Sequence, residues 1–373
     1  MEHKHPPVNL FRLLLKAGIL FAAFNLAFIF VNLEALGKLS LYNRLFPGRE
    51  RFPFGETRAS YNLSLYNLNA MFASHALSGA EKSTREYRVL LIGDSSVWGT
   101  LLTPEQTLAG QLNARSLAAC GRTVRAHNLG YPTISLTKDL MILDQARAYQ
   151  PDLVILLTTL EAFPLDKQFE SPLVANNAER IRHLITSYQL PLNPNDPALT
   201  QPSKWEQTFL SRRRAVADLI RLQLYGALWA STGIDQVYPQ NYERAQTDLE
   251  PGIEYHGLSQ PAELRGALAF EVLDALMNAA AAPTLLVNEP MLISRGTNSG
   301  IRYNFFYPRW AYDEYRRLLA ERAAGRGWNY LDLWNLVPAD QFTNSAIHLT
   351  PFGETMLTDE IAKTIQLICK ERQ

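Results

Sequence analysis

Cysteine and net charge are the two things this sequence of 373 residues has least of. It has two cysteines, Cys120 and Cys369, which are too few for a disulfide framework or a zinc cage. Nothing in the sequence indicates whether these two are paired, and they do not fix the compartment. The 36 basic and 36 acidic residues cancel, so we expect no nucleic-acid partner bound through a general basic field.

Repeats and low-complexity segments are also absent. Apolar residues make up 47% of the chain and charged residues 19%, which excludes a disordered or fibrous protein. The length allows two domains of roughly 150 residues, or one α/β domain with insertions.

The longest apolar run lies near the N-terminus, over residues 10–33, and only Arg12 and Lys16 interrupt it with charge. A helix over this run is long enough to cross a bilayer if both basic side chains reach one interface, although Asn25 and Asn32 weaken the prediction. A cleaved signal peptide and a buried soluble helix are the alternatives. We expect an uncleaved single-pass anchor with the lipid bilayer as its partner. Basic residues on both sides leave its orientation undecided.

The rest of the chain divides into a connector over 37–86 and an α/β domain over 87–373, after an anchor over 1–36. Short apolar runs alternate with segments of helical periodicity, which predicts a parallel sheet covered on both faces. The predicted strands are 87–92, 123–129, 153–157, 284–288 and 328–333. The predicted helices are 104–118, 136–149, 262–280, 311–324 and 351–370.

An insertion over about 164–261 separates the third and fourth predicted strands, and its stretch 203–233 has helical periodicity. One interpretation is a solvated pair of helices packed on the sheet. The alternative is a lid, or an element that faces a membrane or a partner.

Two side chains with complementary chemistry follow predicted strands. Ser95 comes directly after the first strand, and His348 lies in the loop before the last helix. The carboxyl ends of parallel strands share one edge of a sheet, where ligands bind. A serine hydroxyl becomes a good nucleophile when a base such as histidine takes its proton.

The residues around this pair resemble the SGNH, or GDSL, hydrolase family. Ile92-Gly93-Asp94-Ser95 with Gly99, and His348-Leu349-Thr350-Pro351 with Gly353, carry the resemblance. Asn128-Leu129-Gly130 resembles the family's second block. The resemblance implies a flavodoxin-like three-layer α/β/α sandwich with a parallel sheet and no cofactor or metal.

The resemblance also assigns roles to individual residues. Ser95 is the implied nucleophile, His348 the base, and the N–H groups of Ser95 and Gly130 the oxyanion donors. Asp94 belongs to the same motif and is counted with the catalytic residues.

Two departures from the family pattern concern the oxyanion hole and the catalytic acid. Glu161 stands where the third block has an asparagine, and Ser345 stands at the acid position, three residues before the histidine. Asn344 or Ser345 could orient the imidazole, but neither stabilises imidazolium as a carboxylate does. The other carboxylates that could substitute are Asp332, Asp340 and Glu289, of which Glu289 directly follows the fourth strand.

Aromatic and basic residues follow the fourth strand on the same predicted edge. Tyr303, Asn304 and Arg309, with Glu161, are candidates for substrate binding, since aromatic rings stack on sugars and arginine pairs with anions. Ordinary packing of a long loop is the alternative.

One anchor on one domain of this kind resembles, in architecture, the alginate O-acetylation proteins and the D-alanine-transfer protein of teichoic acid modification. This resemblance implies an extracytoplasmic serine esterase or O-acyltransferase that acts through an acyl-Ser95 intermediate. Its substrate would be an envelope glycan or lipid, and a membrane protein is a further candidate partner. The alternatives are a catalytically degraded domain that serves as a binding module or accessory subunit, and a lipase-like enzyme with a buried N-terminal helix.

Overall fold

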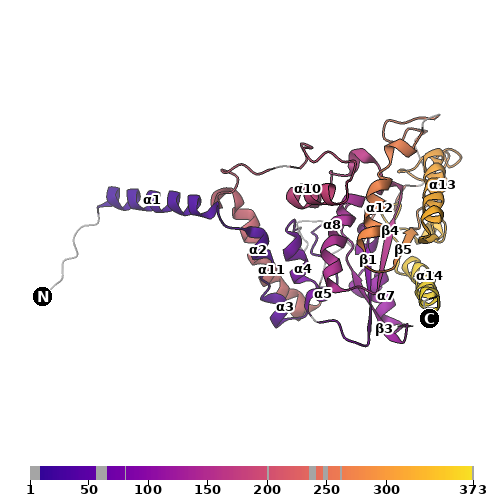
Figure 1. The fold of residues 1–373 in the computed structure, drawn as a ribbon, viewed down its shortest axis with the longest axis horizontal. Helices are drawn as coiled ribbons and strands as arrows, with labels where there is room; N and C mark the ends of the chain where they lie inside the picture. Colours follow the sequence, from indigo (N-terminus) through magenta and orange to yellow (C-terminus); the bar gives the residue numbers. More distant parts are fainter. Residues whose placement is uncertain are drawn as a thin grey trace.

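The computed structural model describes residues 9–55, 65–79, 81–199, 201–234, 241–246, 251–260 and 263–371. A mixed sheet of six strands lies at the centre of the body, in the order β2-β3-β1-β4-β5-β6 (Figure 1). The strands are β1 (Glu86–Ile92), β2 (Ala118–Ala119), β3 (Arg122–Asn128), β4 (Leu153–Thr158), β5 (Thr284–Asn288) and β6 (Asn329–Asp332).

The five predicted strands are all present, and they run parallel to one another. Numbered by themselves along the chain, their order is 2-1-3-4-5, the flavodoxin-like doubly wound order. The sequence analysis missed β2, which pairs antiparallel with β3 and makes the sheet mixed. A strand of two residues is too short to show a periodic pattern.

The helices that follow are listed in chain order. The α-helices are α1 (Leu10–Phe28), α2 (Leu33–Gly37), α3 (Tyr42–Leu45), α4 (Leu68–Ser74), α5 (Ala76–Gly79), α6 (Ser95–Trp98), α7 (Leu108–Ala114), α8 (Leu136–Ala146), α9 (Pro172–Ala175), α10 (Ala178–Ser187), α11 (Phe209–Thr232), α12 (Phe270–Ala279), α13 (Arg309–Arg326) and α14 (Pro351–Lys370). The 3₁₀ turns are η1 (Pro104–Gln106), η2 (Arg147–Tyr149), η3 (Leu160–Ala162), η4 (Leu165–Lys167), η5 (Arg265–Ala267) and η6 (Ala339–Gln341).

Alternate residues of the central strands belong to two separate cores. Leu90 and Leu156 pack with α8, α12 and α13 on one face of the sheet. Leu91 and Ile155 pack with α7 and α14 on the other face. Because side chains in a strand point to opposite faces in turn, this division gives three layers.

Two predicted helices are shorter in the structure than the sequence suggested. The prediction over 104–118 was wrong at both ends, because Thr107 caps α7 by accepting from Gly110 N, and 118 lies in β2. The prediction over 262–280 began too early, because Leu268 pairs in extended form with Pro164 before α12 starts. Residue 262 lies outside the described residues.

The connector belongs to the body of the molecule. Phe52, Leu68 and Met71 are fully buried and share one core with Leu90 of β1. Within residues 37–55, 65–79 and 81–86 the chain therefore packs as part of the domain rather than as a free linker.

The insertion contributes α9, α10 and α11 to the same face of the body. Its long helix α11 packs on the α3 segment, where the Tyr42 ring lies against Gly226 and Trp229. The close approach depends on the glycine, since a Cβ at Gly226 would lie 2.2 Å from the tyrosine ring. Residue 261, the predicted end of the insertion, lies outside the described residues.

The two cysteines form a disulfide between the turn that joins β2 to β3 and the end of α14. Cys120 and Cys369 are 249 residues apart in the sequence and 5.3 Å apart between Cα atoms. Closing a loop of this length restricts the unfolded chain, which stabilises the fold by about 5 kcal/mol in the chain-entropy account.

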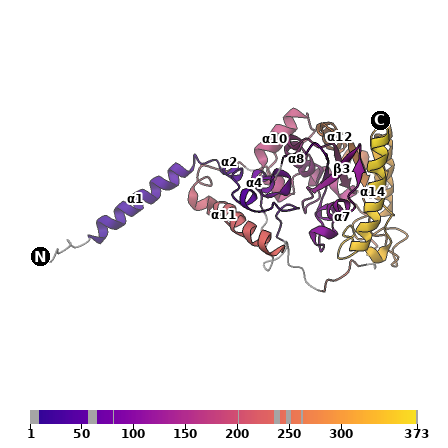
Figure 2. The ribbon, with the colours of Figure 1, turned by 90° about the horizontal axis from the view of Figure 1, so that it is seen from below.

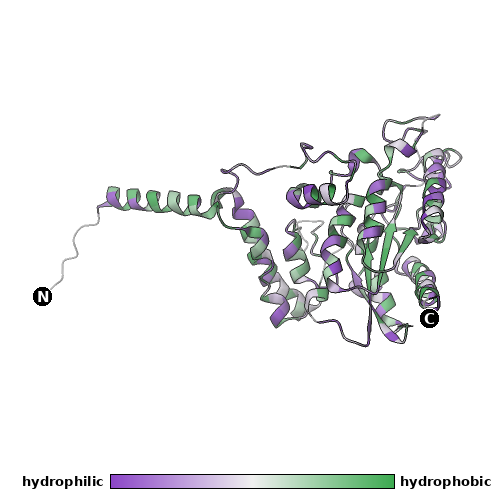
Figure 3. Ribbon diagram, viewed as in Figure 1, coloured by the Kyte–Doolittle hydropathy of each residue, from purple (hydrophilic) through white to green (hydrophobic). Residues whose placement is uncertain are grey.

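Helix α1 projects away from the body, and apolar side chains cover its surface (Figures 1 and 3). It is the one helix among the described residues that is long and apolar enough to cross a membrane, and a signal sequence would have the same properties. The predicted span over 10–33 was too long, because α1 ends at Phe28 and Asn32 caps α2.

Candidate active site

Ser95 is the first residue of α6, the short helix that follows β1. Asp94 caps this helix, and its Oδ1 accepts from Ser96 N at 2.8 Å. Gly93 lets the turn close, because a Cβ there would lie 2.6 Å from Val97 Cγ2. Gly99 ends the helix with a φ of 86°, in the left-handed region that favours glycine.

His348 reaches this serine from the loop between β6 and α14. Its Nε2 lies 2.8 Å from Ser95 Oγ, and its Nδ1 lies 2.8 Å from Asn344 Oδ1. An amide oxygen can only accept, so Nδ1 carries the hydrogen and Nε2 is left to accept from the serine hydroxyl. The arrangement is a serine–histidine–asparagine triad.

No carboxylate among the described residues bonds to the imidazole. Burial lowers the pKa of His348 to about 4, so the ring is neutral at pH 7 and can accept a proton there. A neutral amide orients the ring without favouring imidazolium as a carboxylate does, which makes His348 a weak base.

Among the described residues, the other acid candidates make no hydrogen bond to the imidazole. Ser345 has no bond to it, and Glu289 instead accepts from Ser96 Oγ. Asp332 pairs with Arg316 and accepts from Asn288, while Asp340 is exposed at the start of the loop.

The two implied oxyanion donors differ in their surroundings. Gly130 lies against α6, where a Cβ would lie 2.4 Å from Trp98 N, so only glycine fits. Its N–H already donates to Asn128 Oδ1 at 3.0 Å. The N–H of Ser95 has no acceptor among the described residues. Its direction is set by its place as the first residue of α6.

Asn128 holds the second block against the nucleophile helix. Its Nδ2 donates to Val97 O at 2.7 Å while its Oδ1 accepts from Gly130 N. Asn128 stands within the second block of the sequence, where no pattern predicted this role for it.

Glu161, in η3 at the third block, is held by residues of the insertion and its borders. Its carboxylate pairs with Lys167, accepts from Tyr255 OH at 3.3 Å, and lies 3.5 Å from His256 Nε2. The carboxylate that stands in place of the third-block asparagine is therefore paired with a lysine.

A layer of buried ionisable residues lies beneath the nucleophile helix. Lys138 is fully buried, donates to Gly93 O at 2.7 Å and Tyr131 O at 3.1 Å, and pairs with Asp139 at 2.9 Å. Burial and the neighbouring Asp94 raise the pKa of Glu289 well above its usual range. Burial also raises the pKa of Glu354 to about 8.

The connector supports the far side of the same helix. Arg51 donates from Nη1 to Trp98 O at 3.1 Å and to Gly99 O at 2.8 Å, and its guanidinium lies 4.0 Å from the centre of the Trp98 ring. These carbonyls stand at the end of the short helix, where the last C=O groups have no partner within the helix, and Gly99 O also accepts from Leu102 N. No sequence pattern indicated this contact, because the two segments are 47 residues apart.

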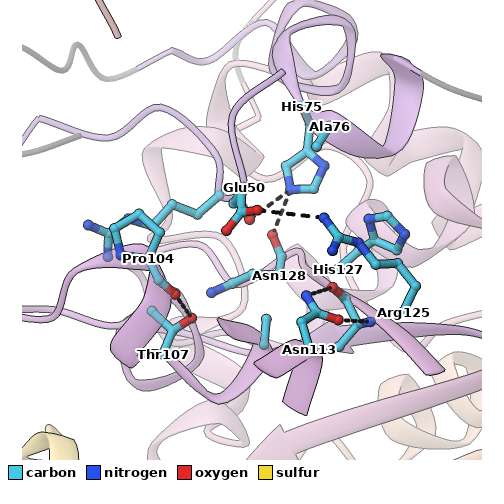
Figure 4. Close-up of a pocket in the computed structure, with 12 residues that line it drawn as sticks. Glu50, His75, Ala76, Pro104, Thr107, Asn113, Arg125, His127 and Asn128 are labelled. Atoms are coloured by element: carbon cyan, nitrogen blue, oxygen red, sulfur yellow. Dashed lines mark hydrogen bonds and ion pairs between the residues drawn. The ribbon is translucent and has the colours of Figure 1, made fainter. Parts of the chain in front are cut away.

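His75 makes a second link from the connector (Figure 4). Its Nδ1 accepts from Leu77 N, so its Nε2 carries the hydrogen and donates to Asn128 O at 3.0 Å. Burial and the nearby His127 lower the pKa of His75 to about 3, so the ring is neutral. A pocket of about 10 Å³, the size of one water molecule, lies beside this contact.

The loop after β5 does not present the expected substrate surface. Asn304 is fully buried, and it accepts from Phe306 N and Tyr307 N while donating to Leu292 O. Tyr303 is also buried, with the guanidinium of Arg309 stacked on its ring at 4.2 Å. Tyr303 and Asn304, which we predicted to bind substrate, organise the loop from within in this structure.

Groups of side chains that could hold a metal ion are not found among the described residues. A pocket of about 440 Å³ lies at the amino ends of β1 and β3, at the opposite edge of the sheet from Ser95.

No family model and no curated protein matches this sequence. Solved structures do match in fold, among them a lipolytic G-D-S-L family member from Veillonella parvula, with 8% identity and a TM-score of 0.36 over 74% of this chain and 96% of that one. An aryl esterase from M. smegmatis matches with 14% identity and a TM-score of 0.35, over 74% and 97%. The carbohydrate acetylesterase Est24 from Sinorhizobium meliloti matches with 14% identity and a TM-score of 0.33, over 75% and 99%. Similarity this low carries no functional argument.

Proposed function

We propose that this protein is a membrane-anchored serine esterase or O-acyltransferase of the SGNH type. One observation carries the proposal: the 2.8 Å contact between Ser95 Oγ and His348 Nε2, which joins residues 253 positions apart at one edge of the sheet. The glycine-bounded turn that holds Ser95, with Gly130 packed against it, supports the SGNH assignment.

The reaction begins when Ser95 Oγ attacks the carbonyl carbon of an ester and His348 Nε2 takes the hydroxyl proton. The Ser95 N–H stabilises the oxyanion of the tetrahedral intermediate. As the intermediate collapses, the imidazolium returns its proton to the departing alcohol, which leaves an acyl group on Ser95. Water then releases the acyl group as an acid, or the hydroxyl of an acceptor takes it as a new ester.

The location follows from two features. Helix α1 supports membrane attachment, and the disulfide between Cys120 and Cys369 supports a domain outside the cytoplasm, because disulfides persist in oxidising compartments. An acyl ester of an envelope glycan or lipid is the substrate class that this location favours.

A fluorophosphonate probe on the purified full-length protein tests the nucleophile. We expect labelling that is lost in Ser95→Ala and kept in Ser96→Ala, the matched variant one residue along, whose hydroxyl bonds to Glu289 instead. Circular dichroism of each variant controls for folding. Equal labelling of wild type and Ser95→Ala would disprove an acyl-Ser95 intermediate.

Two observations favour a second function, that of a catalytically degraded domain acting as a binding module or accessory subunit. His348 is oriented by an amide and Glu161 occupies the third block, so neither supports catalysis as the family's own residues do. A folded wild-type protein that shows no labelling and no turnover of p-nitrophenyl acetate would favour this alternative.

A further inference from the structure

Helix α11 and the α2–α3 segment lie on the edge of the body that faces α1 (Figures 1 and 2), and several large apolar side chains of these two parts are exposed. We call them the apolar platform. Its residues are Leu39, Leu41, Leu45, Phe46, Trp205, Leu210, Ile220 and Leu224. They belong to the α2–α3 segment and to α11 with the turn before it, and Tyr42 N donates to Gln223 Oε1 at 3.0 Å between these two parts. One continuous surface therefore combines two segments far apart in the sequence.

Helix α11 presents a different face to the body. Leu222, Gly226 and Trp229 are buried, whereas Ile220 and Leu224 are exposed by 57% and 66%. Leu210 and Leu224 are 14 residues apart, which returns to the same side of a helix after about four turns. The outward side of α11 thus carries a short apolar stripe formed by Ile220 and Leu224, and the exposed Arg213, Arg214 and Arg221 lie between this stripe and Leu210.

The start of α11 is fixed to the end of α1. The ring of Phe209 packs against Phe24 and Phe28, with centroids 5.1 Å and 5.3 Å away. Asn25 Oδ1 accepts from Leu210 N at 2.9 Å, which caps α11 and buries the one polar side chain in this part of α1. Asn25 weakened the prediction of a membrane span, and its hydrogen bond to α11 explains why a polar residue stands there.

These contacts set the depth of α11. A helix of 19 residues is about 28 Å long, close to the roughly 30 Å hydrocarbon thickness of a bilayer. Asn25 is three residues from the end of α1, about 5 Å along its axis. If α1 spans the bilayer, Leu210 lies at the hydrocarbon boundary, and the following turn of α11 lies among the headgroups.

Side chains suited to this level stand beside Leu210. Arg212, Arg213 and Arg214 occupy the following turn, and none of them forms an ion pair with a described carboxylate. Trp205, 68% exposed, lies in the turn before α11. Arginine pairs with phosphate, and tryptophan is enriched at membrane interfaces.

We propose that α11 lies on the bilayer surface, with its apolar stripe in the interfacial layer and its arginine triplet on the phosphates of anionic lipids. This inference rests on the part of the proposed function in which α1 anchors the protein in the membrane. It does not depend on the reaction at Ser95. The protein is then held by two elements, one across the membrane and one along it, which restricts how the domain can rotate about α1.

Spin labels on the full-length protein in nanodiscs test this, because both native cysteines are in the disulfide and a single new cysteine is labelled selectively. The positions are Leu20→Cys in α1, Leu224→Cys in α11, and the matched control Leu367→Cys on α14, which is 55% exposed on the far side of the body. We expect the ratio of oxygen to nickel-chelate accessibility to be high at Leu20, intermediate at Leu224 and low at Leu367.

The outcomes separate the anchor from the platform. A membrane signal at Leu20 with an aqueous signal at Leu224 would overturn the platform and keep the anchor. An aqueous signal at Leu20 would overturn the anchor and the platform together, without touching the Ser95 chemistry. A Leu224 label that is shielded from both reagents indicates a protein partner or a second copy, which also overturns the proposal.

The arginine triplet is tested with the Leu224 label in nanodiscs of phosphatidylcholine, with and without phosphatidylglycerol. We expect the label to lie deeper in the membrane when anionic lipid is added. Arg212→Gln, Arg213→Gln and Arg214→Gln should each lower the equilibrium constant for insertion of α11 about fivefold, since one arginine near such a surface contributes about 1 kcal/mol. No dependence on lipid charge would overturn this part of the proposal. Arg326→Gln, on α13, is the control and should change nothing.

Discussion

The proposed nucleophile and the proposed base are held in different ways. Ser95 sits on a helix whose ends and underside are bonded by buried groups: Arg51, Asn128 and Lys138 all donate to carbonyls of its turn. His348 lies on a loop and is oriented through its ring by one exposed side chain, Asn344. The position of the nucleophile is thus fixed by the interior of the protein, and that of the base by a surface contact.

This difference has a chemical meaning. Buried hydrogen bonds in a medium of low dielectric are strong, and leaving one partner unpaired is costly, so the nucleophile turn resists displacement. An exposed amide contributes little to the basicity of an imidazole. We therefore expect changes on the nucleophile side to alter stability, and changes on the base side to alter the rate and its pH dependence.

The largest expected effect is the removal of the base. His348→Gln should slow fluorophosphonate labelling and ester turnover by about 10³-fold or more, since the serine loses the group that takes its proton. Rates of labelling and of p-nitrophenyl acetate hydrolysis measure this. His183→Gln, an exposed histidine of α10, should leave both rates unchanged; equal losses in the two variants would contradict the role of His348.

The next effect concerns the neutral carboxyl groups beneath the nucleophile. The pKa of Glu354, raised by burial to about 8, means that the folded state keeps this proton while the unfolded state releases it near pH 4.5. The unfolded state then binds fewer protons, so stability falls as pH rises from about 4.5 to 8, by on the order of 4 kcal/mol.

Replacing Glu354 by glutamine should remove this dependence. Urea unfolding should show Glu354→Gln more stable than wild type at high pH and similar to it near pH 4. Glu371→Gln, an exposed glutamate at the end of the chain, should follow the wild-type curve. A Glu354→Gln curve parallel to wild type would show that Glu354 ionises normally.

Loss of the connector's contact should have a moderate effect. Arg51→Met leaves the buried carbonyls of Trp98 and Gly99 without this donor, and we expect a loss of about 2 kcal/mol in the free energy of unfolding. Labelling of Ser95 should also slow, because the end of α6 is released. Arg44→Met, on the exposed side of α3, should change the free energy of unfolding by less than about 0.5 kcal/mol. A similar loss of stability in both variants would contradict the supporting role of Arg51.

The smallest effect tests the base side directly. Asn344→Asp places a carboxylate on His348 Nδ1, which favours imidazolium and raises the histidine pKa. Activity requires the neutral ring, so the acidic limb of the rate profile should move up from about pH 4, and the rate at neutral pH should rise about tenfold or more. Ser345→Asp, at the family's acid position, should not reproduce this, since Ser345 does not contact the ring.

The hydrophobic pattern of the sequence predicted the strands and helices well wherever the pattern extended over several residues. The apolar runs of β1, β4 and β5 and the periodicity of α14 were sufficient, because buried parallel strands and amphipathic helices impose their own period on the sequence. The same reasoning failed at β2 and at the ends of α7 and α12, where tertiary packing decides, and it did not indicate that Tyr303 and Asn304 are buried. It also could not assign a partner to Arg51 or His75.

The sequence by itself indicated the candidate nucleophile and base and the helix that is apolar enough for a membrane, because residue type and short-range spacing are local properties. Only the tertiary structure decided which groups meet. It selected Asn344 over Ser345, placed Glu289 on Ser96 rather than on His348, joined Cys120 to Cys369, and set α11 against the end of α1. Such contacts depend on strand order and on the packing of distant segments, which no short window of sequence contains.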